Sequence, residues 1–147
     1  MRYTINTASA ADMARHLWAC SPDFTPPLSE KVDIPAYAEK MSQRAVNFEA
    51  WHGDTLVGMV NAYLNDLDSR TGYITNVSTL RTHTGQGIGA QLLARCLAYA
   101  TERGFRNLGL EVNAHSPGAV RLYERHGFVQ TEQAGDMLKM NCSLPQT

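Results

Sequence analysis

A glycine-rich stretch between a strand-like and a helix-like segment constrains this chain more than any other feature. It reads Thr84-Gly85-Gln86-Gly87-Ile88-Gly89-Ala90. Residues 73–80 before it are rich in β-branched and aromatic side chains, and residues 91–100 after it are good helix formers with helical apolar spacing. Glycine lets the backbone approach an anion closely, and the first N–H groups of a helix have no partner within it. The order of strand, glycine turn and helix therefore predicts a site for a phosphorylated ligand.

The composition narrows the class of protein. The chain has 147 residues, 44% of them hydrophobic, which fits one domain over residues 1–147. A formal charge of -1 gives no electrostatic basis for binding nucleic acid or an anionic membrane, and no apolar run approaches the ~20 residues of a membrane span. The N-terminus lacks the blocks of a secretory signal, and three widely spaced cysteines indicate neither a disulfide framework nor a zinc site. We expect a cytoplasmic protein with no nucleic-acid or membrane partner.

Hydrophobic periodicity along the chain predicts a mixed α/β fold. On the first predicted helix, Met13, Leu17 and Trp18 are placed on the inward face, and Ser9 or Thr7 caps its start. The predicted strands are residues 2–6, 45–51, 55–64, 73–80, 107–112, 128–131 and 137–142, and the predicted helices are residues 10–20, 33 or 34 to 44, the glycine turn to about 103, and 116–126.

Residues 21–28 interrupt the helices, because prolines remove backbone donors and disfavour the helix before them. The segment nevertheless keeps two large apolar side chains, Phe24 and Leu28. It is predicted either as a loop pinned to the core or as one wall of a pocket.

Three segments resemble the GNAT superfamily of N-acetyltransferases, whose members transfer an acyl group from coenzyme A to an amine. They are residues 77–90, residues 110–112, and the run SPGAVRLYERHGF from Ser116 to Phe128. Gly87 and Gly89 match the glycines of the family's pyrophosphate signature, whereas Thr84 stands where the family has Arg or Gln. The later run matches the pattern A..LYE..GF, with Ser116 in place of its usual leading Asn. The resemblance implies a central twisted, mostly antiparallel sheet with one splayed parallel strand pair, flanked by helices.

The resemblance implies acetyl-CoA as co-substrate and no metal. Backbone N–H groups of the glycine turn would hold the pyrophosphate, and the strand before it would bind pantetheine through its main chain. Ser116 is a candidate cap of its helix, and Asn113 a candidate pantetheine contact. The predicted cofactor-binding residues are Val77, Ser78, Thr79, Thr84, Gly85, Gln86, Gly87, Ile88, Gly89, Ala90, Asn113 and Ser116.

Two residues are predicted to be catalytic. Tyr123 matches the family's general acid, and an ordinary tyrosine stays protonated at neutral pH and can donate to a thiolate; the alternative is a core tyrosine. Glu111 is the candidate base, on a strand between Leu110 and Val112 in the middle of the sheet, where loss of contact with water would tune it for accepting a proton. The alternatives are a glutamate paired with Arg106, or a water chain that ends on Glu49 or Asn76.

The resemblance predicts direct acetyl transfer to a primary amine, and three hypotheses for the function follow, two of which differ in the acceptor. The first is a small molecule such as an amino sugar or an amine metabolite, the second a protein N-terminus or lysine. The third is a non-catalytic module that only binds acyl-CoA. A dinucleotide site is discarded, because the spacing of Gly85, Gly87 and Gly89 does not fit that fingerprint. The family also leads us to expect a homodimer through the exposed edges of the last predicted hairpin.

Overall fold

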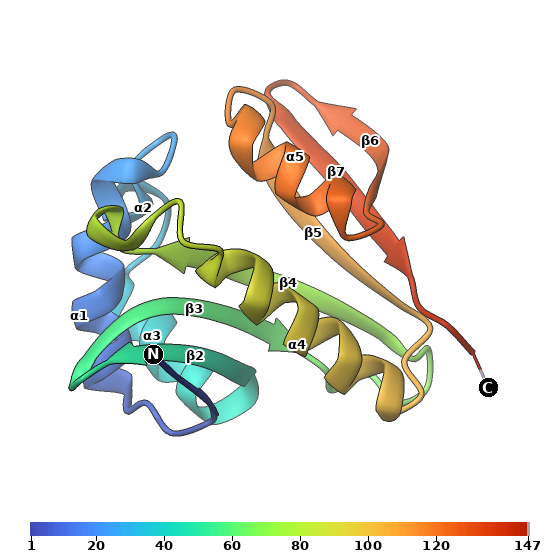
Figure 1. The fold of residues 1–147 in the computed structure, drawn as a ribbon. Coiled ribbons are helices and arrows are strands. Elements are labelled where there is room, and N and C mark those ends of the chain that lie inside the picture. Colours follow the sequence, from blue (N-terminus) through green and yellow to red (C-terminus); the bar gives the residue numbers. More distant parts are fainter. Residues whose placement is uncertain (147) are drawn as a thin grey trace.

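The computed structural model describes residues 1–146 and contains a seven-stranded sheet with helices packed on its faces (Figure 1). The strand order is β1-β2-β3-β4-β5-β7-β6, and every neighbouring pair is antiparallel except β4 and β5. This confirms the predicted α/β architecture. The strands are β1 (Arg2–Ile5), β2 (Val46–His52), β3 (Thr55–Tyr63), β4 (Thr71–Thr79), β5 (Asn107–Asn113), β6 (Val129–Ala134) and β7 (Met137–Ser143).

Four of the five helices in residues 1–146 agree closely with the sequence pattern, whereas the short helix Leu28–Lys31 was not predicted. Ser9 caps α1 with a capping box, in which its hydroxyl accepts from the Asp12 N–H and the Asp12 carboxylate accepts from the Ser9 N–H. Trp18 is 52% exposed, so its predicted inward position is wrong. The helices are α1 (Ala10–Cys20), α2 (Leu28–Lys31), α3 (Ile34–Arg44), α4 (Ile88–Glu102) and α5 (Pro117–Arg125), with 3₁₀ turns η1 (Ser21–Asp23) and η2 (Arg81–His83).

The predicted splay of the parallel pair is confirmed. The β4–β5 pairing ends after Tyr73 and Gly109, and the two strands then diverge (Figure 1). In the register of β4 with β3, Thr75 is an extra residue, which makes a β-bulge. The Tyr37 hydroxyl donates to the Thr75 carbonyl at 2.7 Å and so holds this bulge from α3. Because a bulge bends its strand, it accounts for β4 leaving β5 at this point.

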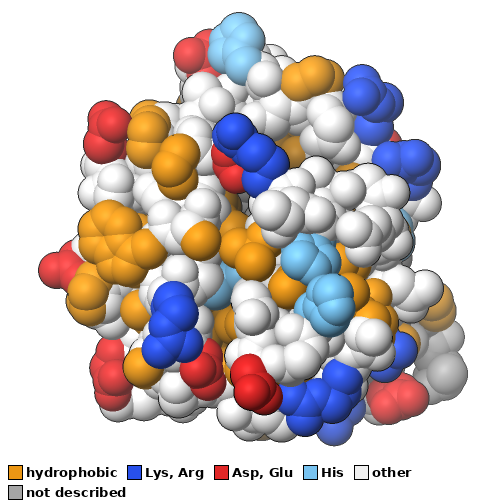
Figure 2. Space-filling view, turned by 60° about the vertical axis from the view of Figure 1, so that its left-hand side comes forward, with side chains coloured by type: hydrophobic (Ala, Val, Ile, Leu, Met, Phe, Trp, Pro, Cys, Tyr) orange, Lys and Arg blue, Asp and Glu red, His pale blue; other side chains and the backbone are white. Residues whose placement is uncertain are grey.

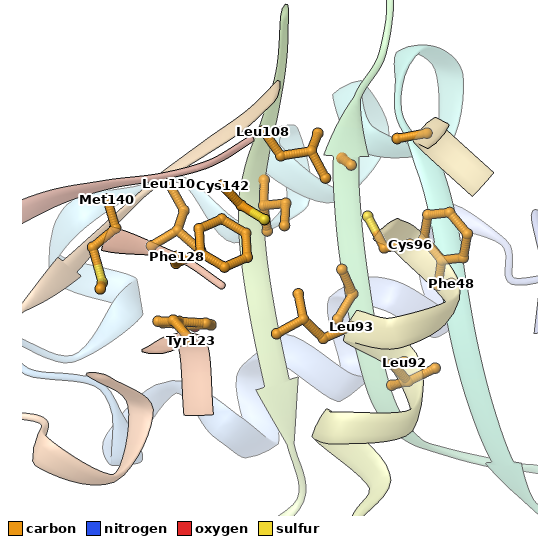
Figure 3. Close-up of a cluster of buried hydrophobic side chains, with 14 of the residues drawn as sticks. Phe48, Leu92, Leu93, Cys96, Leu108, Leu110, Tyr123, Phe128, Met140 and Cys142 are labelled. Atoms are coloured by element: carbon orange, nitrogen blue, oxygen red, sulfur yellow. The ribbon is translucent and has the colours of Figure 1, made fainter. Parts of the chain in front are cut away.

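Two buried clusters hold the helices on the sheet. The larger lies under α4 and α5 and includes Phe48, Leu93 and Phe128 (Figure 3). It also holds Cys96, which is fully buried, as the apolar spacing of its helix predicts. The smaller cluster lies under α1 and α3 and is built on methionine and aliphatic side chains, among them Met13, Leu17, Met41 and Met59.

Replacing Gly58 with valine is expected to lower the free energy of unfolding by about 1–3 kcal/mol, the usual cost of overpacking. A Cβ at Gly58 would lie 2.7 Å from Cγ2 of Ile88 and 3.2 Å from Cδ1 of Leu92, so the start of α4 would have to move. Urea unfolding measures the change. The control is Gly118→Ala, where an added Cβ meets nothing within 4 Å; this variant should lose no stability. Equal midpoints for Gly58→Val and the parent would contradict the close approach of α4.

Candidate active site

A cavity of about 770 Å³ opens where β4 and β5 diverge. Its walls are formed by the segment after η1, the diverging halves of β4 and β5, and α5. It therefore brings together segments that lie far apart in the sequence. The predicted site residues that line it are Val77, Ser78, Thr79, Thr84, Glu111, Asn113, Ser116 and Tyr123, whereas Gly85, Gln86, Gly87, Ile88, Gly89 and Ala90 follow Thr84 outside its lining.

The glycine turn ends at the N-terminus of α4. Gly85 and Gly87 have φ angles of +80° and +79°, a conformation that other residues rarely adopt. A Cβ at either position would meet nothing within 4 Å, so the turn borders open space. In the part of the chain that the structure describes, no side chain caps the first turn of α4. The first N–H groups of α4 are therefore available to an anion.

The side chain of Thr84 is engaged within its own turn. Its hydroxyl donates to the Arg81 carbonyl at 2.9 Å. Arg81 in turn forms an ion pair with Asp23, which ties η2 to η1. Because the Thr84 proton is used, an anion at this turn would rely on backbone donors.

The open edge of β4 presents main-chain groups to the cavity. The Leu80 N–H donates to a β3 carbonyl at 2.8 Å, and bonding alternates along an antiparallel ladder. Ser78 therefore bonds with β3 through its backbone, whereas Val77 and Thr79 direct their N–H and C=O groups to the opposite side. Because β5 has left that side, these groups can bind an extended ligand.

Tyr123 reaches the same cavity from α5. It is 7% exposed and packs edge-on against Phe128, with ring centroids 5.9 Å apart (Figure 3). Burial raises the pKa of Tyr123 to about 12. Its hydroxyl therefore stays protonated at neutral pH and can serve as a proton donor.

Glu111 lines the cavity but is exposed, which differs from the desolvated position expected for it. The strand alternation is as predicted, yet no element covers this face of β5 enough to exclude water. Across the β5–β7 pair Glu111 lies opposite Lys139, which is ion-paired with Glu132 at 3.1 Å. Among the ion pairs of residues 1–146, none joins Glu111 to Arg106.

Asn113 links the two walls of the cavity. Its Nδ2 donates to the Thr25 carbonyl at 3.1 Å, and its Oδ1 accepts from the His115 N–H at 2.8 Å. Ser116 occupies the cap position of α5, but its side chain makes no capping hydrogen bond, which corrects the cap expected for it. Phe24 lines the cavity and Leu28 is both buried and part of the lining, so the segment is pinned to the core and also forms a wall.

The two alternative ends for a water chain have different surroundings. Glu49 is fully buried, and its carboxylate accepts from the hydroxyls of Thr4 and Thr7 and from the N–H groups of Thr7 and Ala8. This carboxylate holds β1 to β2 and does not line the cavity. Asn76 does line the cavity, is 4% exposed, and has an Oδ1 atom with no hydrogen-bond partner.

The sequence reasoning missed His16, which hydrogen-bonds Ser78 at 2.8 Å from behind the cavity wall. The available signal was its place on the apolar face of α1, between Met13 and Cys20, where a histidine needs a buried polar partner. The identity of that partner depends on packing between segments 62 residues apart.

The distribution of charge, the cysteines and the helix lengths bear on possible partners and metals. Acidic and basic side chains are interspersed on the face seen in Figure 2. Residues 1–146 contain no cluster of three or more His, Cys, Asp or Glu that could hold a metal ion, and their three cysteines are buried and free. No helix in this range is long and apolar enough to cross a membrane.

A mostly antiparallel sheet that splits between its one parallel pair, with a helix starting at the split, defines an α/β protein with the N-acetyltransferase fold. The chain belongs to the GNAT family of acetyltransferases, whose sequence model matches residues 10–128.

Among its relatives, the uncharacterized N-acetyltransferase YsnE of Bacillus subtilis is 35% identical over 101 residues, which are 67% of this chain and 66% of the relative. The N-alpha-acetyltransferase MAK3 of Arabidopsis thaliana is 29% identical over 87 residues, which are 58% of this chain and 46% of the relative. The chain thus spans about two thirds of one relative and less than half of the other.

Two solved structures share the fold. The ribosomal-protein-S18-alanine N-acetyltransferase of Escherichia coli has a TM-score of 0.80 at 18% identity, covering 99% of this chain and 96% of that one. The PaiA N-acetyltransferase of Thermoplasma acidophilum, solved in complex with coenzyme A, has a TM-score of 0.73 at 14% identity, covering 97% and 99%.

Proposed function

We propose that the protein is an acetyl-CoA-dependent N-acetyltransferase that passes the acetyl group directly to a primary amine. The observation that carries the proposal is the placement of three features at one cavity, two of them in its lining and the third directly beside it at Thr84. These are the uncapped start of α4 behind the glycine turn, the unpaired edge of β4, and the protonated hydroxyl of Tyr123. Membership of the GNAT family supports the same activity.

The donor would bind along the open edge of β4. The N–H groups of Ile88, Gly89 and Ala90 would hold the pyrophosphate, because they lie at the positive end of α4. The main-chain groups of Val77 and Thr79 would bind the pantetheine arm as a strand would. Thr84, Gly85, Gln86, Gly87 and Ser78 shape this wall, and Asn113 and Ser116 form the opposite one.

The chemistry then needs only one proton donor from the protein for the leaving group. The amine nitrogen bonds to the thioester carbon, the carbon–sulfur bond breaks, and the thiolate takes the Tyr123 proton. The pKa of Tyr123, about 12, lies well above that of a thiol, near 8.5. Tyr123 is therefore still protonated when the thiolate forms beside it and can donate to the sulfur. The nitrogen loses a proton on becoming an amide, and this proton returns to the ionised Tyr123.

The acceptor that this cavity favours is a small cationic amine. Its volume lies within the range of small-molecule sites, roughly 300–1,000 Å³. Phe24, Tyr37 and Tyr73 line it, and aromatic faces attract ammonium groups. Of its two carboxylates, Asp23 is ion-paired with Arg81, so Glu111 is the one free to attract the cationic amine.

A protein N-terminus is the second candidate acceptor. MAK3 is an N-alpha-acetyltransferase and the Escherichia coli protein is a ribosomal-protein-S18-alanine N-acetyltransferase, and both are similar to this chain. Glu111 lines the cavity and is exposed to solvent, so the first residues of a peptide would have access to it.

The proposal is tested by release of free thiol from acetyl-CoA in the presence of a panel of amines. The panel contains 2-phenylethylamine, spermidine, glucosamine and an alanine-leading peptide, with the N-terminally blocked peptide as control. We expect release with at least one small amine. Thiol release with the unblocked peptide and with none of the small amines would show that the acceptor is a protein N-terminus. Coenzyme A binding by calorimetry without any release would instead support a binding module and contradict the enzyme.

A further inference from the structure

A continuous line of buried hydrogen bonds runs from α1 through β4 and β3 to β2. His16, Ser78, Asn76, Asn61 and Asn47, here called the polar chain, are all at most 6% exposed. The successive donor–acceptor distances along it are 2.8, 3.0, 3.0 and 2.8 Å. Burying polar side chains costs free energy unless they are hydrogen-bonded, and apolar side chains would fill the same space without that cost. The polar chain therefore suggests a role beyond packing.

Backbone carbonyls at both ends of the polar chain fix the direction of every bond in it. Nδ2 of Asn47 donates to the Met41 carbonyl at 3.1 Å, so its Oδ1 must accept from Asn61. By the same step Asn61 accepts from Nδ2 of Asn76, which also donates to Ser78.

At the other end, the Leu56 carbonyl lies 2.8 Å from Nδ1 of His16, and a carbonyl only accepts. Nδ1 therefore carries the proton and Nε2 of a neutral imidazole is an acceptor. Consequently the Ser78 hydroxyl donates its proton to Nε2. His16, Ser78 and the Leu56 carbonyl thus have the arrangement of a base, a hydroxyl and an orienting group.

This direction leaves two acceptor positions unused, both on cavity-lining residues. Oδ1 of Asn76 is buried and has no partner. Oγ of Ser78 donates once and accepts once, and a hydroxyl oxygen can accept a second time. The two residues are two positions apart on β4, so their side chains share one face of the strand, the face covered by α1.

Resting on the proposed function, we infer that Asn76 and Ser78 receive the ammonium group of the acceptor, and that His16 takes its proton through Ser78. Oδ1 of Asn76 has no donor, Oγ of Ser78 can accept from a second one, and an ammonium is a group of donors alone. Asn76 and Ser78 would touch the substrate. His16 acts through Ser78 and is a positioning and proton-accepting residue behind the wall.

The proton balance is as follows. An N–H of the ammonium passes its proton to Oγ of Ser78 while the hydroxyl proton of Ser78 moves to Nε2 of His16. The serine is unchanged, the amine is neutral, and the imidazole carries one positive charge. The amine lone pair then bonds to the thioester carbon, the carbon–sulfur bond breaks, and the thiolate takes the Tyr123 proton. The second proton that the nitrogen loses on becoming an amide returns to Tyr123.

For the next turnover, His16 must return its proton to water, and a second cavity is the route that we expect. This cavity has a volume of about 140 Å³ and is lined by His16, by Asp12 and Arg15 of α1 and by Asp54 of the β2–β3 turn. These three side chains of Asp12, Arg15 and Asp54 are the charged groups around the ring. The neutral Cys20 thiol also lies beside it, with its sulfur 3.6 Å from Nε2. Burial lowers the pKa of His16, so the ring is neutral and able to accept a proton at pH 7.

The test is kcat as a function of pH from 5 to 10 for the parent and His16→Gln, with the panel amine that is turned over fastest. A glutamine can still donate to the Leu56 carbonyl or accept from Ser78, but it holds no titrating proton. We expect parent kcat to level off at a lower pH than an ordinary histidine would give, because burial lowers the pKa of His16 and the base is already neutral there. In His16→Gln only amine that arrives deprotonated reacts, so kcat should be at least tenfold lower at pH 7 and approach the parent value near pH 10.

Two further variants separate this role from a structural one. Ser78→Ala should lower kcat at pH 7 and also raise KM for the amine, because it removes an oxygen that touches the substrate. His126→Gln is the matched control, since His126 bonds only the Leu122 carbonyl at 2.9 Å and does not line the cavity. It should keep the parent pH profile. The two histidine variants should bind coenzyme A within about twofold of the parent, a difference below 0.5 kcal/mol.

A ratio of parent to His16→Gln kcat that stays constant from pH 5 to 10 would overturn the inference, because structural damage lowers the rate equally at every pH. It would leave the proposed function standing, since the parent would still release thiol. If the parent released no thiol with any amine, the proposed function would fail and this inference with it.

Discussion

Replacing Gly87 with glutamate is expected to weaken coenzyme A binding at least about 100-fold, because a like charge facing the pyrophosphate costs several kcal/mol. Gly87 directly precedes α4, has a φ of +79°, and borders open space. A glutamate there would put a carboxylate and its bulk where the first N–H groups of α4 point. Isothermal titration calorimetry with coenzyme A measures the loss.

The matched control for this variant is Gly135→Glu. Gly135 also has a positive φ, +59°, and an added Cβ there also meets nothing within 4 Å, but it lies in the β6–β7 turn. It thus repeats the backbone strain and the added charge away from α4. Affinity near the parent value is expected for the control. Normal coenzyme A affinity in Gly87→Glu would contradict the proposal that the pyrophosphate binds at this turn.

Replacing Tyr123 with phenylalanine is expected to lower turnover roughly 100-fold, at the lower end of what general acids contribute. The ring and its packing against Phe128 remain, so the affinity for coenzyme A should change by less than about twofold. Because burial raises the pKa of Tyr123 to about 12, the parent should show no loss of activity from tyrosine ionisation below about pH 11. Steady-state kinetics from pH 6 to 10 measure both effects.

Tyr99→Phe is the control for the loss of a hydroxyl. Tyr99 is a partly buried tyrosine of α4 that packs on Phe48 at 5.4 Å and does not line the cavity. Its variant should keep the parent turnover. If Tyr123→Phe kept it as well at every pH, Tyr123 would be a core residue and the leaving thiolate would take its proton from elsewhere.

The parts of the fold that local patterns determine could be predicted from the sequence. Ser9 caps α1 and the glycine turn starts α4, because capping and left-handed turns depend on a few adjacent residues. Every predicted strand is present, since alternation is visible within one segment. The largest error in a strand is the end of β6, at Ala134 instead of residue 131.

The parts that depend on packing between distant segments could not be predicted. Trp18 fits the helical apolar stripe, but α1 presents it to solvent. Glu111 alternates as expected, yet its exposure depends on the gap that the Thr75 bulge opens between β4 and β5. The contact of His16 with Ser78 joins α1 to β4, and no local pattern specifies it.

The Thr84 hydroxyl, turned toward the Arg81 carbonyl, has a consequence for how such a protein can diverge. The proposed donor site is made of main-chain atoms, so it would need the glycines Gly85 and Gly87 and few specific side chains. Selection for a new acceptor can then change the cavity walls at Phe24, Tyr37 or Tyr73 without touching the atoms that recognise the donor. The fold itself is kept while sequences drift apart, as the 14% and 18% identities of the two solved structures that share it show.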